Sequence, residues 1–380
     1  MSRAMNRRIF LKGLLTVSAS GAALGVIGCG PKSTPVPTPA PTAAAAPTAT
    51  SAPPAPTSVP PTSAPPTAIP PTASAIPPPA TVAAAPATAA TIASKAAAPA
   101  TAAPAAAATG AYLAVAKGAN ADPREITRRA IAAIGGIERF VKKGTEVIIK
   151  PNVCTAYYPF EYAATTNPEV VAALVQLCLE AGAKRVRVMD FPFGGTPQAS
   201  FDKSGIAAAA KAAGSTIETM SNMKYRDVQI PQGKRLKQWK VYGDILDADV
   251  LINVPIAKDH GSATLTLGMK NLMGVVLDRN GMHSRGLHQS IADISSVVRP
   301  HLTVVDAIRI LTNNGPTGGN LNDVKKLDTV IASADIVAAD AFATTLFNMK
   351  PADIDYIRFG DEMGLGKMDL KSLKIEQVSV

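Results

Sequence analysis

Short apolar runs alternate with longer amphipathic segments from about residue 110 onwards. The short runs have the length and β-branched composition of buried strands, and the longer segments have helical spacing or capping residues. This alternation predicts an α/β fold with a mainly parallel sheet flanked by helices. The expected strands are 111–117, 146–150, 185–189, 250–254, 302–305, 329–332 and 374–378, with weaker candidates at 216–218 and 228–230. The expected helices are 122–141, 170–181, 204–213, 288–298 and 333–347, with a solvated hairpin at 231–240 and a loop at 281–286.

The stretch 250–274 departs from this alternation. A buried-type strand is followed by three titratable residues, and a helix-like segment at 262–273 then carries a lysine and an asparagine on an apolar body. Buried charged groups are costly unless they are paired. Open α/β sheets bind ligands at the carboxyl ends of their strands. We therefore predict the functional site here, at Lys258, Asp259, His260, Lys270 and Asn271.

Polar residues also follow the other expected strands. In a parallel sheet these strand ends share one edge, so a crevice lined by lysines, carboxylates and a histidine is expected there. The alternative is that polar residues only mark where each strand leaves the core, and the pattern alone favours neither interpretation. The residues concerned are Lys150, Asn152, Asp190, Asp306 and Ser333.

The predicted site has residues suited to bind and act on an anion. His260 is the candidate acid/base or ligand, and Lys258 and Lys270 are the candidates to bind an anionic substrate or cofactor and take part in catalysis. Asp190, Asp306 and Asp340 are expected to orient these groups. The glycine-rich loop 314–319 lacks nucleotide-binding spacings, but its amides could bind an anion. The expected anion-binding residues are Lys150, Asn152, Asp190, Asn271, Asp306, Gly315, Gly318 and Gly319.

The histidines and cysteines are the candidate metal ligands. His260, His283 and His288 lie close in sequence, so a metal site is one hypothesis, and solvated or satisfied histidines are the other. The cysteines are Cys29, Cys154 and Cys178, without a CxxC pair, so we expect no iron–sulfur cluster from this chain alone. A redox role would need a separate redox partner. A disulfide between Cys154 and Cys178 stays an alternative to free thiols.

Composition changes the interpretation of the first hundred residues. Residues 31–109 hold 21 of the 32 prolines and otherwise consist almost wholly of Ala, Thr and Ser, which predicts a disordered linker over 30–109. Six of the positive charges and none of the acids precede residue 110, so the net charge of +10 leaves only +4 for 110–380. That balance, with 4% aromatic residues, does not predict nucleic-acid binding.

The first 29 residues resemble an export signal. The segment 6–12, NRRIFLK, resembles a twin-arginine signal, and Val26-Ile-Gly-Cys29 resembles a lipobox. These features predict a bacterial lipoprotein that is exported to the cell envelope and held at a membrane by lipid on Cys29. The alternative is an uncleaved N-terminal anchor. The expected organisation is a signal peptide at 1–29, the linker at 30–109 and one α/β domain at 110–380.

Several motifs together resemble the DUF362 family, a domain of unknown function, over about residues 112–350. Lys258-Asp-His260 and Lys270-Asn271 match positions that are typical of the family. Many relatives carry a ferredoxin-like module with cysteine ligands, and this chain has no cysteine after Cys178. The resemblance is compatible with a cofactor- or metal-assisted enzyme, or a redox-associated protein, acting on an anionic small molecule. The alternatives are a non-catalytic ligand-binding lipoprotein and a purely structural envelope protein. The motifs are Lys150-Pro-Asn, Thr166-Asn-Pro-Glu, Glu180-Ala-Gly-Ala, Asn253-Val-Pro, Lys258-Asp-His, Leu267-Gly-Met-Lys-Asn-Leu-Met-Gly, Asp306-Ala, Asn314-Gly-Pro-Thr-Gly-Gly, Ala332-Ser-Ala-Asp and Asp340-Ala.

Overall fold

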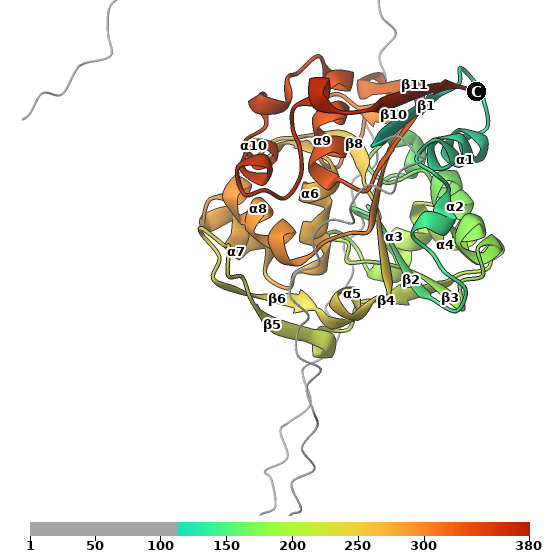
Figure 1. Cartoon of the computed structure of the whole chain (residues 1–380). Helices are drawn as coiled ribbons and strands as arrows, with labels where there is room; N and C mark the ends of the chain where they lie inside the picture. Colours follow the sequence, from blue (N-terminus) through green and yellow to red (C-terminus); the bar gives the residue numbers. More distant parts are fainter. Residues whose placement is uncertain (1–111) are drawn as a thin grey trace, which may run out of the picture. The chain divides into compact units, whose positions relative to one another are not determined.

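The computed structural model describes residues 112–380 (Figure 1). The predicted signal peptide, the lipidation site Cys29 and the predicted linker lie outside the described residues. Within residues 112–380 no helix is long and apolar enough to cross a membrane.

One large sheet runs through the described residues. Its strand order is β12-β1-β11-β10-β7-β2-β3-β4, with β8 paired to β10 and β9 paired to β8. The strands β10, β7, β2, β3 and β4 are mutually parallel, whereas β11 is antiparallel to both of its neighbours. The predicted mainly parallel α/β sheet is therefore confirmed. The strands are β1 Leu113–Lys117, β2 Glu146–Pro151, β3 Arg185–Asp190, β4 Thr216–Thr219, β7 Val250–Val254, β8 Ile256–His260, β9 Thr264–Thr266, β10 Leu302–Leu311, β11 Val324–Ser333 and β12 Ile375–Ser379.

Helices cover both faces of this sheet (Figure 1). Side chains alternate across a strand, so Ile148 faces the core shared with α8 and α9, while Val147 and Ile149 face the core shared with α1 and α2. The strands buried on both faces consequently read as continuous apolar runs. The helices are α1 Pro123–Ala133, α2 Pro168–Glu180, α3 Pro197–Lys203, α4 Ile206–Ala212, α5 Gly243–Asp247, α6 Gly268–Asn271, α7 Arg279–Ser284, α8 Leu287–Val297, α9 Ile336–Thr344 and α10 Asp355–Glu362.

The segment predicted as a solvated hairpin pairs with the residues before it. β5 Tyr225–Gln229 and β6 Gln238–Tyr242 form a separate antiparallel two-stranded sheet. The Lys240 carbonyl accepts a hydrogen bond from the Leu277 amide (3.1 Å), which attaches this hairpin to the chain that leads into α7.

Several predicted elements have different boundaries in the structure. The helix expected to reach 141 ends at Ala133, because Gly135 and Gly136 follow with positive φ values of 98° and 83°. The strand expected at 302–305 continues to Leu311, and its antiparallel partner begins at Val324 instead of 329. The helix expected to be capped by Ser333 is capped by Asp335, whose carboxylate accepts from the Ala338 amide (2.9 Å).

The largest errors fall in the stretch 250–286. The helix predicted at 262–273 is instead the short strand β9 followed by α6, and the loop predicted at 281–286 is mostly α7. The sequence Ile256–His260, expected as a polar strand tip, is the strand β8. The apolar residues at 265, 267 and 269 have the two-residue spacing of a strand as well as a partial helical spacing, so periodicity alone does not separate these structures.

Candidate functional site

A buried ion pair joins the carboxyl ends of two parallel strands. Lys150 of β2 lies 2.6 Å from a carboxylate oxygen of Asp190 of β3, and both side chains are almost wholly buried. Lys150 Nζ also donates to the Pro151 carbonyl (2.9 Å) and to Asn271 Oδ1 (3.0 Å). Burial lowers the pKa of Lys150, and the charge of Asp190 opposes this effect. All three ammonium protons therefore have acceptors within the protein.

Lys258 is also buried, and its three ammonium protons have acceptors, all of which are neutral. Its Nζ donates to the carbonyls of Ala164 (2.6 Å) and Pro316 (2.9 Å), and to Asn152 Oδ1 (3.2 Å). These acceptors lie in three different segments that surround the end of β8. Lys258 therefore connects these segments, and its charge is balanced by amide and carbonyl dipoles instead of a carboxylate.

Asn271 connects the two lysines through its amide. Its Oδ1 accepts from Lys150 Nζ (3.0 Å) and from Asn152 Nδ2 (2.9 Å), and its Nδ2 donates to Asn253 Oδ1 (2.9 Å). The backbone carbonyls at 150 and 151 are further acceptors, at 3.4–3.5 Å. The structure thus brings together Lys150, Asn152, Asp190, Lys258 and Asn271, as predicted from the strand ends.

Lys270 differs from the other two lysines. It is 9% exposed, yet within residues 112–380 its Nζ has neither a hydrogen-bond acceptor nor a carboxylate within ion-pair distance. Burial lowers its pKa to about 7, and the charges of Lys258 and Arg279 act in the same direction. Lys270 is therefore the one lysine of this group that is available to a ligand.

Arg279 and Cys154 belong to the same neighbourhood. Arg279 Nη2 donates to the Phe191 carbonyl (2.7 Å), and its guanidinium lies over the Phe191 ring, 4.8 Å from the centroid. Burial lowers the pKa of Arg279, whereas the charge of Asp190 raises it. Cys154 is 4% exposed, has a left-handed backbone (φ 58°) and lies 3.4 Å from the Pro316 carbonyl through Sγ.

Sequence reasoning missed these two residues. Arg279 was not singled out in the sequence, and Cys154 was considered only as a possible disulfide partner of Cys178. Cys154 and Cys178 are both free and buried, so the disulfide alternative is wrong. The available signal for Cys154 was its place four residues after Lys150, beyond the same strand end.

His260 is held as a neutral ring. Its Nδ1 accepts from the backbone amides of Ser262 (3.2 Å) and Ala263 (3.3 Å), so in the neutral ring the proton is on Nε2. Burial and then the charge of Lys270 lower the pKa of His260 to about 3. In this state His260 is a hydrogen-bond donor through Nε2, which of the two predicted roles, acid/base or ligand, suits contact with a bound molecule better.

The predicted metal site is not assembled. Within residues 112–380 no group of three or more His, Cys, Asp or Glu side chains is placed to hold a metal ion. The three imidazoles come from β8, α7 and α8, and they do not converge with a carboxylate or thiolate on one point within residues 112–380, although the charge of Lys270 influences His260 and His283 alike. His283 is exposed, and His288 stacks on Tyr356 with ring centroids 5.9 Å apart. The three histidines are close in sequence but do not form a shared metal site, because they lie on short elements that run in different directions.

The glycine-rich loop contributes a carbonyl to the site instead of the expected amides. Gly315 N donates to the Asp259 carboxylate (2.8 Å), and Gly318 N donates to the Asn314 carbonyl (3.0 Å). Gly319 has a φ of 127° and packs against Tyr158, where an added Cβ would lie 3.0 Å from the phenol oxygen. The part of the loop that reaches the lysines is the Pro316 carbonyl, which accepts from Lys258.

Asp306 and Asp340 bind backbone amides and not lysines. Asp306 lies within β10 instead of at its end, and it accepts from the amides of Asn167 (2.7 Å) and Ile308 (2.9 Å). Asp340 accepts from Gly268 N (2.6 Å) and Met269 N (2.8 Å) at the start of α6. Burial raises the pKa of Asp306 to about 6 and that of Asp340 to about 8.

Ser333 does not belong to the shared edge either. It pairs with Thr303 near the beginning of β10, because β11 is antiparallel to β10. The expectation that all strand ends meet held only for the parallel strands.

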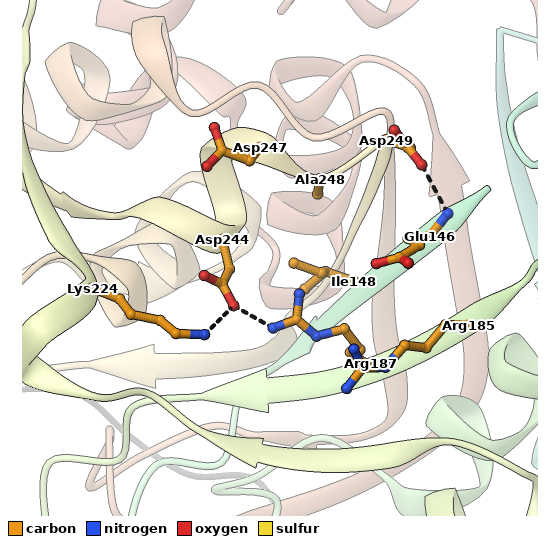
Figure 2. Close-up of a pocket in the computed structure, with 9 residues that line it drawn as sticks. All are labelled: Glu146, Ile148, Arg185, Arg187, Lys224, Asp244, Asp247, Ala248 and Asp249. Carbon is orange, nitrogen blue, oxygen red and sulfur yellow. Dashed lines mark hydrogen bonds and ion pairs between the residues drawn. The ribbon is translucent and has the colours of Figure 1, made fainter. Parts of the chain in front are cut away.

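A separate hollow of about 440 Å³ lies at the opposite, amino-terminal ends of β2, β3 and β7 (Figure 2). Its charged side chains have partners, either in the lining or beside it: Asp244 accepts from Lys224 (2.9 Å) and also binds Arg187, while Arg185 pairs with Glu218. Asp249 accepts from the backbone amide of Glu146 (2.9 Å). This arrangement leaves no unpaired buried cation comparable to Lys270, so we place the candidate site at the carboxyl ends.

Known proteins resemble this chain at two levels. A thylakoid-associated protein of Synechocystis sp. is 29% identical over 246 residues, which are 63% of this chain and 74% of the relative. The lactate racemase apoprotein from Thermoanaerobacterium thermosaccharolyticum superposes with a TM-score of 0.38 at 12% identity. That alignment covers 58% of this chain and 54%, about half, of the racemase chain, a distant likeness from which no chemistry is transferred.

A family description covers the central strands of the sheet and the candidate site, but not β1 and β12. The family model for a domain of unknown function, DUF362, matches residues 147–345, which include β2, the end of β3, β8, α6 and α7. Because this match spans more than half of the 380 residues, the chain belongs to the DUF362 family.

Proposed function

We propose that this protein binds a small anionic molecule, a carboxylate or a phosphate, at the carboxyl ends of β2, β3 and β8 and acts on it as an enzyme. The observation that carries the proposal is the excess of buried positive charge. Lys150, Lys258, Lys270 and Arg279 gather here, and within the described residues Asp190 is the one carboxylate in direct contact with any of them.

Buried cations without partners are unfavourable in the free protein. Removing an ammonium or guanidinium group from water costs several kcal/mol unless an opposite charge or hydrogen bonds replace the solvent. Lys150 and Lys258 have such replacements, whereas Lys270, which is 9% exposed, has no acceptor within residues 112–380 and keeps only a small contact with solvent. A bound anion would provide the missing charge, so this arrangement suits an anionic ligand.

Arg279 supplies the geometry for such a ligand. One of its terminal nitrogens is engaged by the Phe191 carbonyl, and a guanidinium has five N–H donors in a planar fork that matches carboxylate and phosphate oxygens. Lys270 would add a charge-assisted hydrogen bond from another direction. The neutral His260 would add a donor through Nε2.

Binding is tested by titration calorimetry of the full-length protein with oxalate, inorganic phosphate and pyrophosphate. We expect at least one of them to bind, and Arg279→Gln to weaken that binding by about 10- to 100-fold, the loss expected for a hydrogen bond to a charged group. The matched control is Arg235→Gln, which removes an exposed arginine and should leave the affinity unchanged. Equal effects of both substitutions, or no binding of any anion, would contradict the site.

Catalysis is tested separately from binding. The protein is incubated with each anion that binds, and the solution is followed by nuclear magnetic resonance for a new species. Conversion that disappears in Lys270→Gln supports the enzyme. Tight binding without conversion of any bound anion would instead favour the non-catalytic ligand-binding protein.

We also propose that the protein is exported and tethered to a membrane through lipid on Cys29. The support is the twin-arginine-like and lipobox-like sequence, together with the name of a relative, a thylakoid-associated protein. Fractionation of cells producing the full chain is the test. We expect the protein in the membrane fraction and Cys29→Ala in the soluble fraction, and equal distribution of the two proteins would argue against a lipid anchor.

A further inference from the structure

We infer that Lys270 is a nucleophilic amine that forms an imine with an anionic carbonyl compound, of the class of small 2-oxo acids, held at the proposed anion site. The inference rests on the proposed function, since it adds a reaction and a substrate class to the same site.

The three buried lysines allow a comparison within one protein. Lys150 and Lys258 each use three hydrogen bonds or ion contacts, so their nitrogens have no free direction from which to attack a substrate. Lys270 is 9% exposed, against 1% for each of the other two lysines, and among residues 112–380 its Nζ has no acceptor. An amine acts as a nucleophile only when its nitrogen lone pair is not protonated. Of the three lysines, Lys270 is the one without a hydrogen-bond acceptor or a carboxylate that would stabilise its protonated form.

The surroundings of Lys270 favour its neutral form. Lys150 of β2, Lys258 and His260 of β8, and Arg279 and His283 of α7 surround it, and Cys154, which follows β2, is the neighbour whose charge raises its pKa instead of lowering it. Positive charges and desolvation together are the arrangement that activates lysines for imine formation. At pH 7 about half of the amines with a pKa near 7 are neutral, against fewer than about 0.1% of those at 10.4.

The same cations define the substrate. Lys258 and Arg279 repel a proton on Lys270, and they attract the carboxylate of an incoming 2-oxo acid. The lone pair of Lys270 Nζ attacks the carbonyl carbon, and a carbinolamine forms. The carbonyl oxygen then leaves as water with the two amine hydrogens, which leaves a carbon–nitrogen double bond. No oxidant or reductant is needed for this condensation.

The test is reductive trapping on the full-length protein. Glyoxylate or pyruvate is added with sodium cyanoborohydride at pH 7, and the modified lysines are identified by peptide mass spectrometry. We expect the adduct on Lys270 to exceed that on the exposed Lys211 by at least about tenfold, because of the difference in neutral fraction. Acetone, a neutral carbonyl compound of similar size to pyruvate, should modify Lys270 far less.

Two variants complete the design. Lys270→Arg keeps the charge but has no amine that forms a stable imine, and it should lose the selective adduct, whereas Lys211→Arg should react as the original protein does. The comparison of adducts on Lys270 and Lys211 uses the wild-type protein alone. It therefore tests the imine even if Lys270→Arg does not fold.

The outcomes separate the two proposals. If oxalate or phosphate binds but pyruvate and glyoxylate label Lys270 no more than Lys211, the imine is refuted and the anion site stands. If Lys270 reacts equally with acetone and pyruvate and no anion binds, the anion site fails, and with it the substrate class proposed here.

Discussion

Replacement of Lys270 by methionine should stabilise the fold at neutral pH. Methionine is unbranched and has nearly the length of the lysine stem, so it can occupy the same space without a charge. The wild-type protein has to hold a desolvated amine beside Lys258 and Arg279, and this lowers the pKa of Lys270 from its ordinary value of 10.5 to about 7. The free energy of unfolding contains the cost of that environment.

The magnitude follows from the pKa difference. Each unit corresponds to 1.36 kcal/mol, so a fall from 10.5 to about 7 sets an upper limit of about 5 kcal/mol. Relaxation and water penetration reduce such costs, and we expect about 2–4 kcal/mol of stabilisation for Lys270→Met at pH 6.

The lowered pKa of Lys270 also determines in which direction the stability of the wild-type protein changes with pH. The folded pKa of Lys270 is lower than the unfolded one, so between pH 7 and 10.5 the unfolded state binds more protons. The penalty is therefore fully present below about pH 7, decreases as the pH rises, and is absent above 10.5. The advantage of Lys270→Met over wild type should decrease accordingly.

The assay is urea unfolding of wild type and Lys270→Met at pH 6, 7, 8, 9 and 10, in buffers without phosphate or carboxylate anions. Lys211→Met, an exposed substitution in α4, is the control and should stay within about 0.5 kcal/mol of wild type at every pH. A Lys270→Met variant less stable than wild type at pH 6, or a difference that does not change with pH, would refute the reasoning.

Three further substitutions test the contacts around the lysines. Asp190→Asn leaves Lys150 buried without its charge partner and should lower the free energy of unfolding by about 3–5 kcal/mol in urea, with partial recovery in the double variant with Lys150→Met. Gly274→Ala places a Cβ 2.4 Å from Asp190 Oδ1 and 2.7 Å from Lys150 Nζ, so we expect a loss of about 1–3 kcal/mol in thermal unfolding, against less than about 0.5 kcal/mol for Gly261→Ala, whose Cβ meets nothing closer than 3.9 Å. Asp340→Asn turns an amide donor toward one of two backbone amides and should cost about 1–3 kcal/mol by the same assay, whereas unchanged stability would mean that these bonds are replaced by water.

The parts of the fold that the sequence predicted best are its fully buried strands. β7 was predicted with both of its boundaries, because four apolar residues and Asn253 stand between Asp249 and Pro255. β8 was missed as a strand because Lys258, Asp259 and His260 were expected to form the polar tip that follows β7. The side chains of this strand are satisfied by contacts that the local sequence does not contain, so the local pattern was misleading.

The convergence of several strand-end residues was predictable from the sequence, and the hydrogen bonding of each lysine was not. Parallel strand ends brought Lys150, Asn152, Asp190 and Lys258 together as expected. Which lysine remains without acceptors depends on carbonyls and amides that lie far away in sequence. The acceptors of Lys258 are 58 to 106 positions distant along the chain. No spacing rule connects such positions, so three similar lysines could not be ranked before the structure was known.

The hydrogen-bond partners of the nearby carboxylates explain why the site stays positively charged. We expected Asp306 and Asp340 to orient lysines, but each accepts two backbone amides, and Asp259 accepts the amide of Gly315. These bonds fix the start of α2, the start of α6 and the glycine-rich loop, which are the segments that surround Lys258 and Lys270. Because the carboxylate oxygens are occupied in positioning the backbone, they do not neutralise the lysines. The same interactions that build the site therefore leave it positively charged, and an anionic ligand is the partner that such a site lacks.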